Sequence, residues 1–422
     1  MRLLYNLMAY LMYLPFAGYW MVRAIGNPSY REKLGQRFGF SYPHLEKSIW
    51  IHAVSVGEVV AAEPLIKALL NQFPDRPLLV TTVTPTGAAR AKRVFGDRII
   101  HSYIPFETPF AVNRFFRKAD PAIALILETE IWPNLYRGCG SRKIPLVLVS
   151  ARISSRSVKS YRRLLPLLRE TLSHGIFIAA QSKTDARRFI SLGANADRTR
   201  VTGNIKFDIE LEPGILEKGA DFRRKTFGDR PVWIAASTHE GEEQLVLDAH
   251  KALIRKHPDA LLLLVPRHPE RFAQVAELTR KNGFSHVSRT ADRPCDSTDQ
   301  VFLGNTMGEM MMFYAASDIA FVAGSLVPIG GHNLLEPSAL GLPIVFGPHY
   351  FNAPDIAELF ISQSACRLVQ DADELASTVS ELVEDPALAR ELGDKARDIV
   401  MRNRGSLSQL LDVVTPLIEN QG

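Results

Sequence analysis

Residues 48–70 read SIWIHAVSVGEVVAAEPLIKALL. The apolar run Ser48–Val54 predicts a buried strand, and the pattern from Glu58 to Leu70 predicts a helix that follows after a short turn. Units of this kind build parallel sheets whose two faces are covered by helices. The stretch therefore predicts an α/β fold for the region around it.

The same alternation continues along the chain. Further strands are predicted at 78–83, 98–104, 122–127, 146–149 and 176–180, and the helices between them include 108–117 and 157–172. After a polar stretch at 204–214 the pattern restarts, with strands at 232–236, 260–265, 285–287, 301–303, 319–323 and 343–346. Two such series predict two Rossmann-like, doubly wound domains that face each other across a cleft. We assign residues 36–208 to the first domain and residues 209–422, with the C-terminal helices, to the second.

The composition is that of an ordinary globular enzyme. Of the 422 residues, 46% are hydrophobic and 23% are charged, which excludes a disordered or fibrous chain. The sequence contains no GxGxxG fingerprint and no P-loop. It therefore lacks the motifs that usually indicate hydride transfer or ATP hydrolysis. The three cysteines form no disulfide or zinc pattern, and the one DxD string, Asp371–Asp373, is better explained as a helix cap than as a metal site. We expect no metal and no cofactor.

The net charge of +5 is unevenly distributed. Residues 1–48 carry +4, residues 131–169 carry +9 without any acidic side chain, and the remaining chain carries −8. Basic charge confined to two segments indicates a local anionic partner, such as phosphate or a membrane surface, rather than nucleic acid.

The first basic segment contains an apolar stretch, Leu3–Val22, that has no charged residue and has the length of a bilayer-spanning helix. Its aromatic side chains favour the headgroup region of a membrane. We expect residues 1–35 to form an N-terminal membrane-anchor helix with a basic flank, which spans the bilayer or lies in its interface. The alternative is a hydrophobic helix packed on the globular body. Basic residues after Val22 favour the cytoplasmic side for the rest of the chain.

Acidic side chains follow two predicted strands of the first half. Glu58 follows the first strand, and Glu128 and Glu130 follow the strand at 122–127. A carboxylate at the carboxyl end of a parallel strand faces the ligand crevice, where it can accept a proton from a hydroxyl. The alternatives are a simple interaction of Glu58 with the helix dipole and a salt-bridge or capping role for one of the other two acids.

Lys206 lies at the junction of the two halves. A lysine there can reach a departing phosphate and stabilise its negative charge. An exposed lysine in a linker is the alternative.

Three strand-to-helix turns of the second half have anion-binding chemistry. Arg267 ends a predicted strand and can bind phosphate through paired donors. The turn at 304–309 can offer backbone N–H groups to an anion, and the paired glycines in the turn at 324–337 allow the backbone to approach a phosphate closely. Asn333 and Glu336 lie on one helical face, and Glu336 can accept hydrogen bonds from both hydroxyls of a ribose. These turns indicate a nucleotide sugar whose nucleotide binds to the second half.

Five motifs occur in a fixed order: HAVSVGE at 52–58, ETEIWPN at 128–134, GNIKFD at 203–208, PRHPER at 266–271 and GGHNLLEP at 330–337. Together they resemble the 3-deoxy-D-manno-octulosonic acid (Kdo) transferases of lipopolysaccharide synthesis. The resemblance runs over nearly the whole chain and includes the apolar N-terminal segment.

The resemblance implies a GT-B glycosyltransferase that transfers Kdo from CMP-Kdo to a lipid A precursor, a tetraacyl disaccharide bisphosphate, at the cytoplasmic side of a bacterial inner membrane. It implies Glu58 as general base and Glu128 and Lys206 as transition-state stabilisers. The CMP-binding positions that it implies are Pro266, Arg267, Met307, Gly308, Glu309, Asn333, Leu334, Leu335 and Glu336.

The hypothesis that follows is a metal-independent, inverting displacement. Arg156, Arg162 and Arg163 are candidates for contacts with the acceptor phosphates, with a solvated helix face as the alternative. Two rival functions are a GT-B-like nucleotide-sugar 2-epimerase and a non-catalytic, two-lobed protein that binds sugar or lipid.

Overall fold

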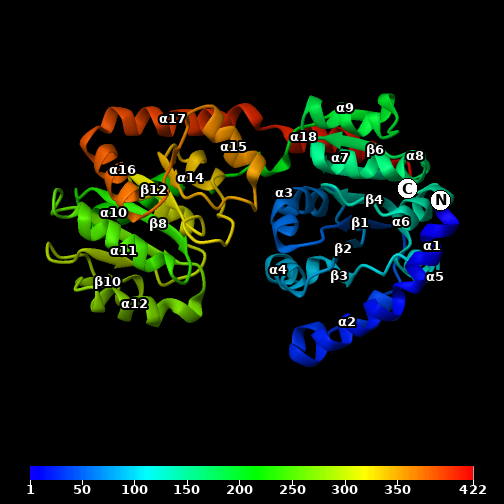
Figure 1. The fold of residues 1–422 in the computed structure, drawn as a ribbon, viewed down its shortest axis with the longest axis horizontal. Coiled ribbons are helices and arrows are strands. Elements are labelled where there is room, and N and C mark those ends of the chain that lie inside the picture. The colour runs from blue at the N-terminus through cyan, green and yellow to red at the C-terminus, as the bar shows by residue number, and fades with distance from the viewer. Residues whose placement is uncertain (422) are drawn as a thin grey trace. The chain divides into compact units, whose positions relative to one another are not determined.

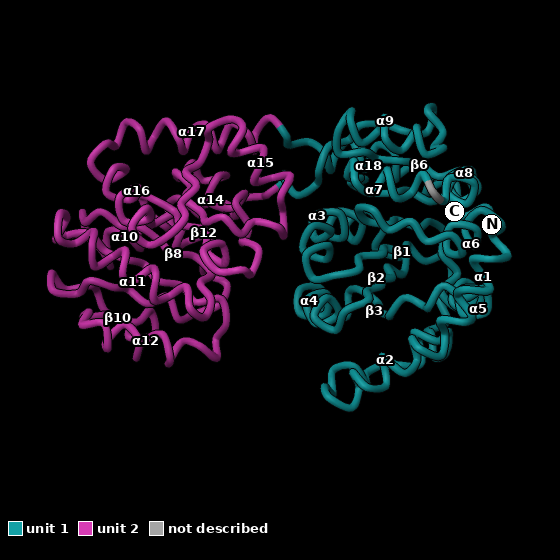
Figure 2. Tube along the Cα trace, viewed as in Figure 1, with its two compact units in different colours: residues 1–208, 403–422 teal, residues 209–402 magenta. Residues whose placement is uncertain are grey.

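A computed structural model describes residues 1–421, except for the Arg163 side chain. The chain forms two compact units, residues 1–208 with 403–422 and residues 209–402 (Figure 2). Each unit contains one parallel sheet with helices packed on it (Figure 1).

The first unit contains a seven-stranded sheet in the order β3-β2-β1-β4-β5-β6-β7. Its strands are β1 (Ser48–His52), β2 (Leu78–Thr82), β3 (Ile100–Tyr103), β4 (Pro121–Leu127), β5 (Leu146–Ala151), β6 (Phe177–Ala180) and β7 (Thr199–Val201). Every residue of β1, β2, β4 and β5 is buried, as expected of strands that are covered on both faces. Trp50 packs into the hydrophobic cluster on one face of the sheet and Ile51 into the cluster on the other, because successive side chains of a strand point to opposite faces.

The helices of the first unit alternate with these strands. They are α3 (Val56–Gln72), α4 (Pro85–Phe95), α5 (Pro109–Ala119), α6 (Pro133–Ser141), α7 (Ser155–Tyr161), α8 (Leu165–Leu172) and α9 (Lys183–Ser191).

The second unit repeats the architecture. Its sheet has the order β10-β11-β9-β8-β12-β13-β14, with all recorded pairs parallel. The strands are β8 (Val232–Thr238), β9 (Leu261–Pro266), β10 (His286–Ser288), β11 (Val301–Leu303), β12 (Ile319–Val322), β13 (Ile344–Phe346) and β14 (Arg367–Leu368). The helices that accompany them are α10 (Ile215–Thr226), α11 (Glu242–Leu253), α12 (Phe272–Lys281), α13 (Met310–Ala315), α14 (Leu335–Ala339), α15 (Pro354–Ser362), α16 (Ala372–Glu384) and α17 (Pro386–Asn403).

The last helix of the chain returns to the first unit. Helix α18 (Ser406–Glu419) buries Leu410, Val414 and Ile418 in the same hydrophobic cluster as α3. The Asp208 carboxylate accepts hydrogen bonds from the N–H groups of Gly405 at 2.6 Å and Leu407 at 2.7 Å, which satisfies donors at the start of α18. Residues 403–421 therefore belong with the first unit and not with the second domain, to which we assigned them from the sequence.

The N-terminal segment forms two helices, α1 (Arg2–Leu11) and α2 (Tyr13–Gly26), and they pack against the first unit. The buried Arg37 guanidinium lies 3.6 Å from the Trp20 ring centroid of α2 and 4.0 Å from that of Tyr103 at the end of β3. Such cation–π contacts fix α2 to the globular body. Over residues 1–421, none of the helices has both the length and the apolar composition of a membrane span. The N-terminal segment thus forms two shorter helices where we predicted one, and its role as a membrane anchor stays a prediction.

Candidate active site

The predicted catalytic residues of the first unit lie where its strand order reverses. Strands β1 and β4 are neighbours, although β2 and β3 separate them in the sequence. Glu58 follows β1 in the first turn of α3, and Glu128 follows β4 directly. Open parallel sheets bind ligands at this point, beyond the carboxyl ends of the strands.

Glu58 is a largely buried carboxyl group with a backbone donor. It accepts a hydrogen bond from the Val54 N–H in the turn between β1 and α3. Burial raises the pKa of Glu58 to about 8; the charges of Glu128 and Glu130 act in the same direction, and the Val54 N–H and Lys206 oppose them. A pKa near neutrality suits a group that must take a proton from a hydroxyl.

Glu128 lies between two cations. Lys206 Nζ donates to one carboxylate oxygen at 2.7 Å, and Arg152 Nε donates to the other at 3.0 Å. Burial by itself would raise the pKa of Glu128, but these two cations outweigh it and lower the pKa below its usual value. The carboxylate is therefore ionised, and its charge holds both cations at the end of β4.

The backbone at Glu128 is unusual. Its φ of +55° is in the left-handed region, which costs free energy for a residue with a side chain. The neighbouring Thr129 hydroxyl donates to the Arg152 carbonyl, and this bond holds the turn in place. We interpret the strained backbone as the means by which the Glu128 side chain is directed to Lys206 and Arg152.

Lys206 is positioned by its own short turn, the 3₁₀ helix η6 (Ile205–Phe207). Asn204 caps the turn by accepting a hydrogen bond from the Lys206 N–H at 3.0 Å. The Ile205 N–H donates to the Ser150 hydroxyl at the end of β5 at 3.2 Å. Lys206 is thus a fixed part of the site, and the alternative of an exposed linker lysine is wrong.

Glu130 also belongs to this site. It accepts a hydrogen bond from the Trp132 indole N–H at 2.6 Å, and its carbonyl accepts one from the Tyr136 hydroxyl at 3.0 Å. Burial raises the pKa of Glu130, and the charge of Glu128 adds to this effect. The two acids of the ETE motif therefore have different roles: Glu128 forms ion pairs, and Glu130 holds Trp132.

The second unit brings two histidines together at its own reversal of strand order. His239 follows β8 and His332 follows β12, and these strands are neighbours. Their Nε2 atoms are 2.8 Å apart, so one ring donates an N–H hydrogen bond to the other. Burial, together with the nearby charges of Arg267 and His268, lowers the pKa of His239 to about 4 and that of His332 to about 3. Both rings are therefore neutral at pH 7.

The paired glycines of the GGHN motif are required by local packing. Gly330 and Gly331 have φ values of +109° and +75°, and a Cβ on Gly330 would come within 2.6 Å of the Asn352 side chain. Their N–H groups both donate to the Gly324 carbonyl, at 3.0 and 2.7 Å. Those two N–H groups are therefore engaged within the turn.

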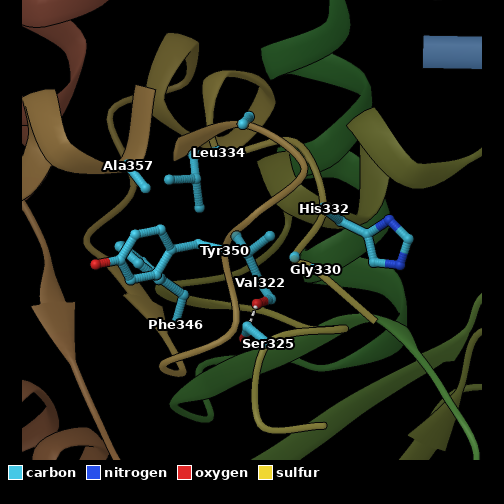
Figure 3. Close-up of a pocket in the computed structure, with 10 residues that line it drawn as sticks. Val322, Ser325, Gly330, His332, Leu334, Phe346, Tyr350 and Ala357 are labelled. Carbon is cyan, nitrogen blue, oxygen red and sulfur yellow. Dashed lines mark hydrogen bonds between the residues drawn. The ribbon is translucent and has the colours of Figure 1, made fainter. Parts of the chain in front are cut away.

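The GGHN turn lies over a small apolar cavity (Figure 3). The cavity measures about 10 Å³ and is lined by side chains that include Leu334, Phe346 and Tyr350. This volume is enough for about one water molecule, so the cavity is a packing gap and no nucleotide fits inside it. The His332 ring points away from it.

The other predicted donor-binding residues lie at the end of β9 and after β11 and β12 of the second unit. Glu309, which precedes α13 and follows Met307 and Gly308, accepts hydrogen bonds from Arg289 at 3.0 and 3.3 Å. Asn333 donates to Glu336 at 3.1 Å, so these two side chains do lie side by side, before and within α14. Leu334 and Leu335 are buried, and Pro266 ends β9.

Three residues of the two sites were missed by the sequence analysis. Glu242 is fully buried and accepts hydrogen bonds from the N–H groups of Gly324 at 2.7 Å, Ser325 at 3.0 Å and Leu326 at 3.0 Å, so it fixes the turn after β12. His239 and Arg152 complete the list. A sequence signal existed for all of them, because each lies within a few residues of the carboxyl end of a strand.

The predicted acceptor-binding arginines lie on and after α7, which follows β5, and the DxD string lies at the start of α16. Arg156 on α7 and Arg162 after it are exposed, while the Arg163 side chain lies outside the described part of the chain. Asp371 accepts a hydrogen bond from the Glu374 N–H at 2.9 Å at the start of α16, which confirms its predicted role as a helix cap.

Comparisons with known proteins agree with the motifs. Residues 32–209 match the family model described as 3-Deoxy-D-manno-octulosonic-acid transferase (kdotransferase), and residues 229–399 match the one described as Glycosyl transferases group 1. The chain is 41% identical to the 3-deoxy-D-manno-octulosonic acid transferase of Haemophilus influenzae over 94% of both chains. It is 37% identical to that of Bordetella pertussis over 88% of this chain and 87% of the relative.

Solved structures share the two-unit fold. The UDP-GlcNAc 2-epimerase of Neisseria meningitidis, bound to UDP-GlcNAc, is 14% identical and covers 86% of this chain and 100% of its own, with a TM-score of 0.53. That likeness concerns the fold alone and is compatible with either a transferase or an epimerase. The distinction comes from the sequence relatives: with 41% identity over nearly its full length, the chain belongs to the Kdo transferase family of glycosyltransferases.

Proposed function

We propose that the protein transfers Kdo from CMP-Kdo to a lipid A precursor with inversion of configuration, and that Glu58 is the general base. The observation that carries this proposal is the arrangement in the first unit, where a protonatable Glu58 lies near an ion-paired Glu128 and Lys206. A base and a fixed cation at one site are what a direct displacement by a hydroxyl requires.

In the proposed reaction, a glucosamine hydroxyl of the acceptor attacks C2 of Kdo. The hydroxyl proton passes to a carboxylate oxygen of Glu58, the new C2–O bond forms, and the bond between C2 and the CMP phosphate oxygen breaks with its electron pair retained by CMP. Glu58 must be ionised before the attack. Since its pKa is about 8, the reaction accelerates as the pH rises toward that value.

We assign stabilisation of the departing CMP to cations of the protein. Lys206 is the cation of the first unit, and its position is fixed by Glu128. Arg267 is the candidate in the second unit, next to the neutral His239–His332 pair. A fixed cation at the place where negative charge develops lowers the barrier without a proton transfer, so the proposal needs no metal.

The acceptor's phosphates are proposed to contact the basic surface after β5. Arg156 and Arg162 are exposed there, in a segment, 131–169, that contains nine basic residues and no acidic one. Each basic residue near an anionic surface contributes roughly 1 kcal/mol of binding free energy. Charge reversal at both positions should raise the KM for the acceptor and weaken binding to anionic vesicles; if neither changes, this assignment fails.

The membrane partner is proposed to contact α1 and α2. These helices expose large apolar side chains, among them Leu3 at 86%, Leu14 at 79% and Val22 at 69% of their surface. A helix pair that packs one face on the protein and exposes apolar side chains on the other suits the interface of a bilayer. We place the protein on the cytoplasmic side of the inner membrane, where such a lipid acceptor would be reached.

The experiment that tests the proposed function uses the purified full-length protein with CMP-Kdo and tetraacyl lipid A precursor. Mass spectrometry should show the precursor increased by the mass of Kdo residues, together with released CMP. Glu58→Ala should abolish transfer while CMP binding and thermal stability remain. An unchanged precursor alongside a chemically altered CMP-sugar would indicate an epimerase, and two unchanged ligands would indicate a binding protein.

A further inference from the structure

Glu107 is a buried carboxyl group that the proposed reaction does not use. It lies after β3 with 5% of its surface exposed, and burial raises its pKa to about 7. Three donors converge on it: the Tyr5 hydroxyl, the Asn134 N–H and the Leu135 N–H, each at 2.8 Å. Because a buried carboxyl group with three hydrogen-bond donors is held firmly in place, Glu107 connects the helices to which these donors belong.

One side of this connection is the N-terminal helix α1. The Tyr5 hydroxyl donates a hydrogen bond to the Glu107 carboxyl group. The next residue, Asn6, accepts a hydrogen bond from the Asn134 side-chain amide at 3.0 Å. Arg2, one turn earlier, forms an ion pair with Glu170. These three residues project from one face of α1, while Leu3, Leu7 and Leu11 are exposed on the remainder of its surface.

The other side of the connection is the segment that carries the active-site acids. Asn134 and Leu135 form the first turn of α6, directly after the residues Glu128–Trp132. The side chain of Asn134 also donates to the Glu107 carbonyl at 2.7 Å, so this turn is held from two directions. Through it, the position of α1 is linked to the segment that contains Glu128 and Glu130.

We propose that Glu107 is a positioning residue for the reaction and that α1 is part of the scaffold of the active site in addition to being a membrane contact. Glu107 joins α1 to the first turn of α6 and so fixes the segment 128–134 in its strained conformation. An exposed apolar helix that is tied to the active-site segment also gives a membrane surface a means to affect turnover, because a bound and ordered α1 holds Glu107 in place.

The contact itself is tested by hydrogen exchange, which does not depend on activity. Two variants of the full-length protein are compared. Tyr5→Phe removes only the hydroxyl that donates to Glu107. Tyr10→Phe makes the same change on the exposed part of the same helix. Tyr5→Phe should increase exchange at the Asn134 and Leu135 amides at least fivefold, and Tyr10→Phe should leave them unchanged. Unchanged exchange in Tyr5→Phe, or an increase spread evenly over the first unit, overturns the proposal.

The expected effect of the Glu107 contact on the reaction rests on the proposed function. It is measured with a water-soluble, deacylated acceptor in the absence of vesicles, so that membrane attachment does not contribute to the rate. Tyr5→Phe should lower kcat at least fivefold while the KM values for both substrates remain within twofold of wild type. Equal kcat in the two Tyr→Phe variants overturns the positioning role. Absence of transfer by the wild-type protein would instead contradict the proposed function, and the exchange experiment would still decide whether Glu107 holds the segment.

Discussion

Lys206 Nζ lies 2.7 Å from the Glu128 carboxylate, although the two residues are 78 positions apart in the sequence. Arg152 binds the second oxygen of the same carboxylate at 3.0 Å. Glu128 is therefore the common partner of two cations, and the role that we propose for it in the reaction is to hold Lys206 in position.

This relationship predicts that substitutions of Glu128 and Lys206 are not additive. Glu128→Gln and Lys206→Ala should each lower kcat by about 10² to 10³, the range found when one fixed electrostatic group is removed. The double variant should be hardly slower than the worse single variant, because each change destroys the same unit. The kcat of the two single variants and of the double variant is measured from the steady-state rate of CMP release. The ion pair Glu63–Arg90, on α3 and α4, is the matched control, and Glu63→Gln should retain wild-type kcat; additive losses at Glu128 and Lys206 would contradict the shared role.

The pH dependence of the reaction follows from Glu58. Its pKa of about 8 in the free protein means that the active, ionised form is the minor one at pH 7. The value of kcat/KM should therefore rise with pH and level off above about pH 8, since this ratio reports the free enzyme. Initial rates from pH 5.5 to 9.5 check the prediction. A profile that is already flat at pH 6 would exclude Glu58 as the titrating base.

The architecture followed closely from the sequence, for an identifiable reason. Every strand that we predicted is present, because strands covered on both faces consist of continuous apolar residues. The two missed strands, β7 and β14, each lie at one edge of a sheet, and their residues are partly or fully exposed. They lack the apolar signal on which the prediction rested.

Helix boundaries depended on features that periodicity does not show. We predicted one helix at 157–172, and the structure contains α7, a 3₁₀ turn and α8. Pro166 is in the first turn of α8, where its missing N–H prevents the preceding helix from continuing. The position of α18 was equally hidden, because only tertiary packing decides which sheet a C-terminal helix covers.

The residues of the candidate site could be singled out individually from the sequence, but their contact partners could not. Glu58, Glu128 and Lys206 each follow a recognisable signal, whereas the Arg152–Glu128 and His239–His332 contacts join distant parts of the chain. Their proximity results from the parallel order of the strands, in which the carboxyl ends of neighbours meet at one edge.

The His239–His332 pair predicts a specific defect in donor binding. Replacing His332 with Gln should weaken CMP binding about tenfold, the loss expected when one buried hydrogen-bonding pair next to Arg267 is broken. Isothermal calorimetry with the full-length protein measures the Kd. His257, which bonds to Ser380 and Glu384 in the same unit, provides the control. His257→Gln should bind CMP as the wild type does, and an equal loss in both variants would show a general effect on the unit.

Glu58 should also make the protein less stable at alkaline pH. Because its pKa is raised from 4.5 to about 8 in the folded protein, the folded state holds this proton more strongly than the unfolded state between these values. The free energy of unfolding contributed by Glu58 therefore falls as the pH rises through this window and stays low above it. Glu58→Gln removes the titration, so its Tm should exceed that of the wild type by more at pH 8.5 than at pH 5. A Tm difference that does not change with pH would contradict the raised pKa.

Asp208 predicts how the last helix is held to the first unit. Its carboxylate accepts the Gly405 and Leu407 N–H groups, and Asp208→Ala leaves both donors at the start of α18 without this partner. Loss of such a cap costs about 0.5 to 2 kcal/mol, so urea unfolding should show a decrease in stability within this range. Limited proteolysis should become faster within residues 403–421, since α18 is then less firmly attached. Asp412 is an exposed acid on α18 itself, and Asp412→Ala should change neither measurement. Asp208 directly follows the turn that carries Lys206, so Asp208→Ala should also lower kcat. Full activity together with a loosened α18 would show that the two functions of the GNIKFD motif are independent.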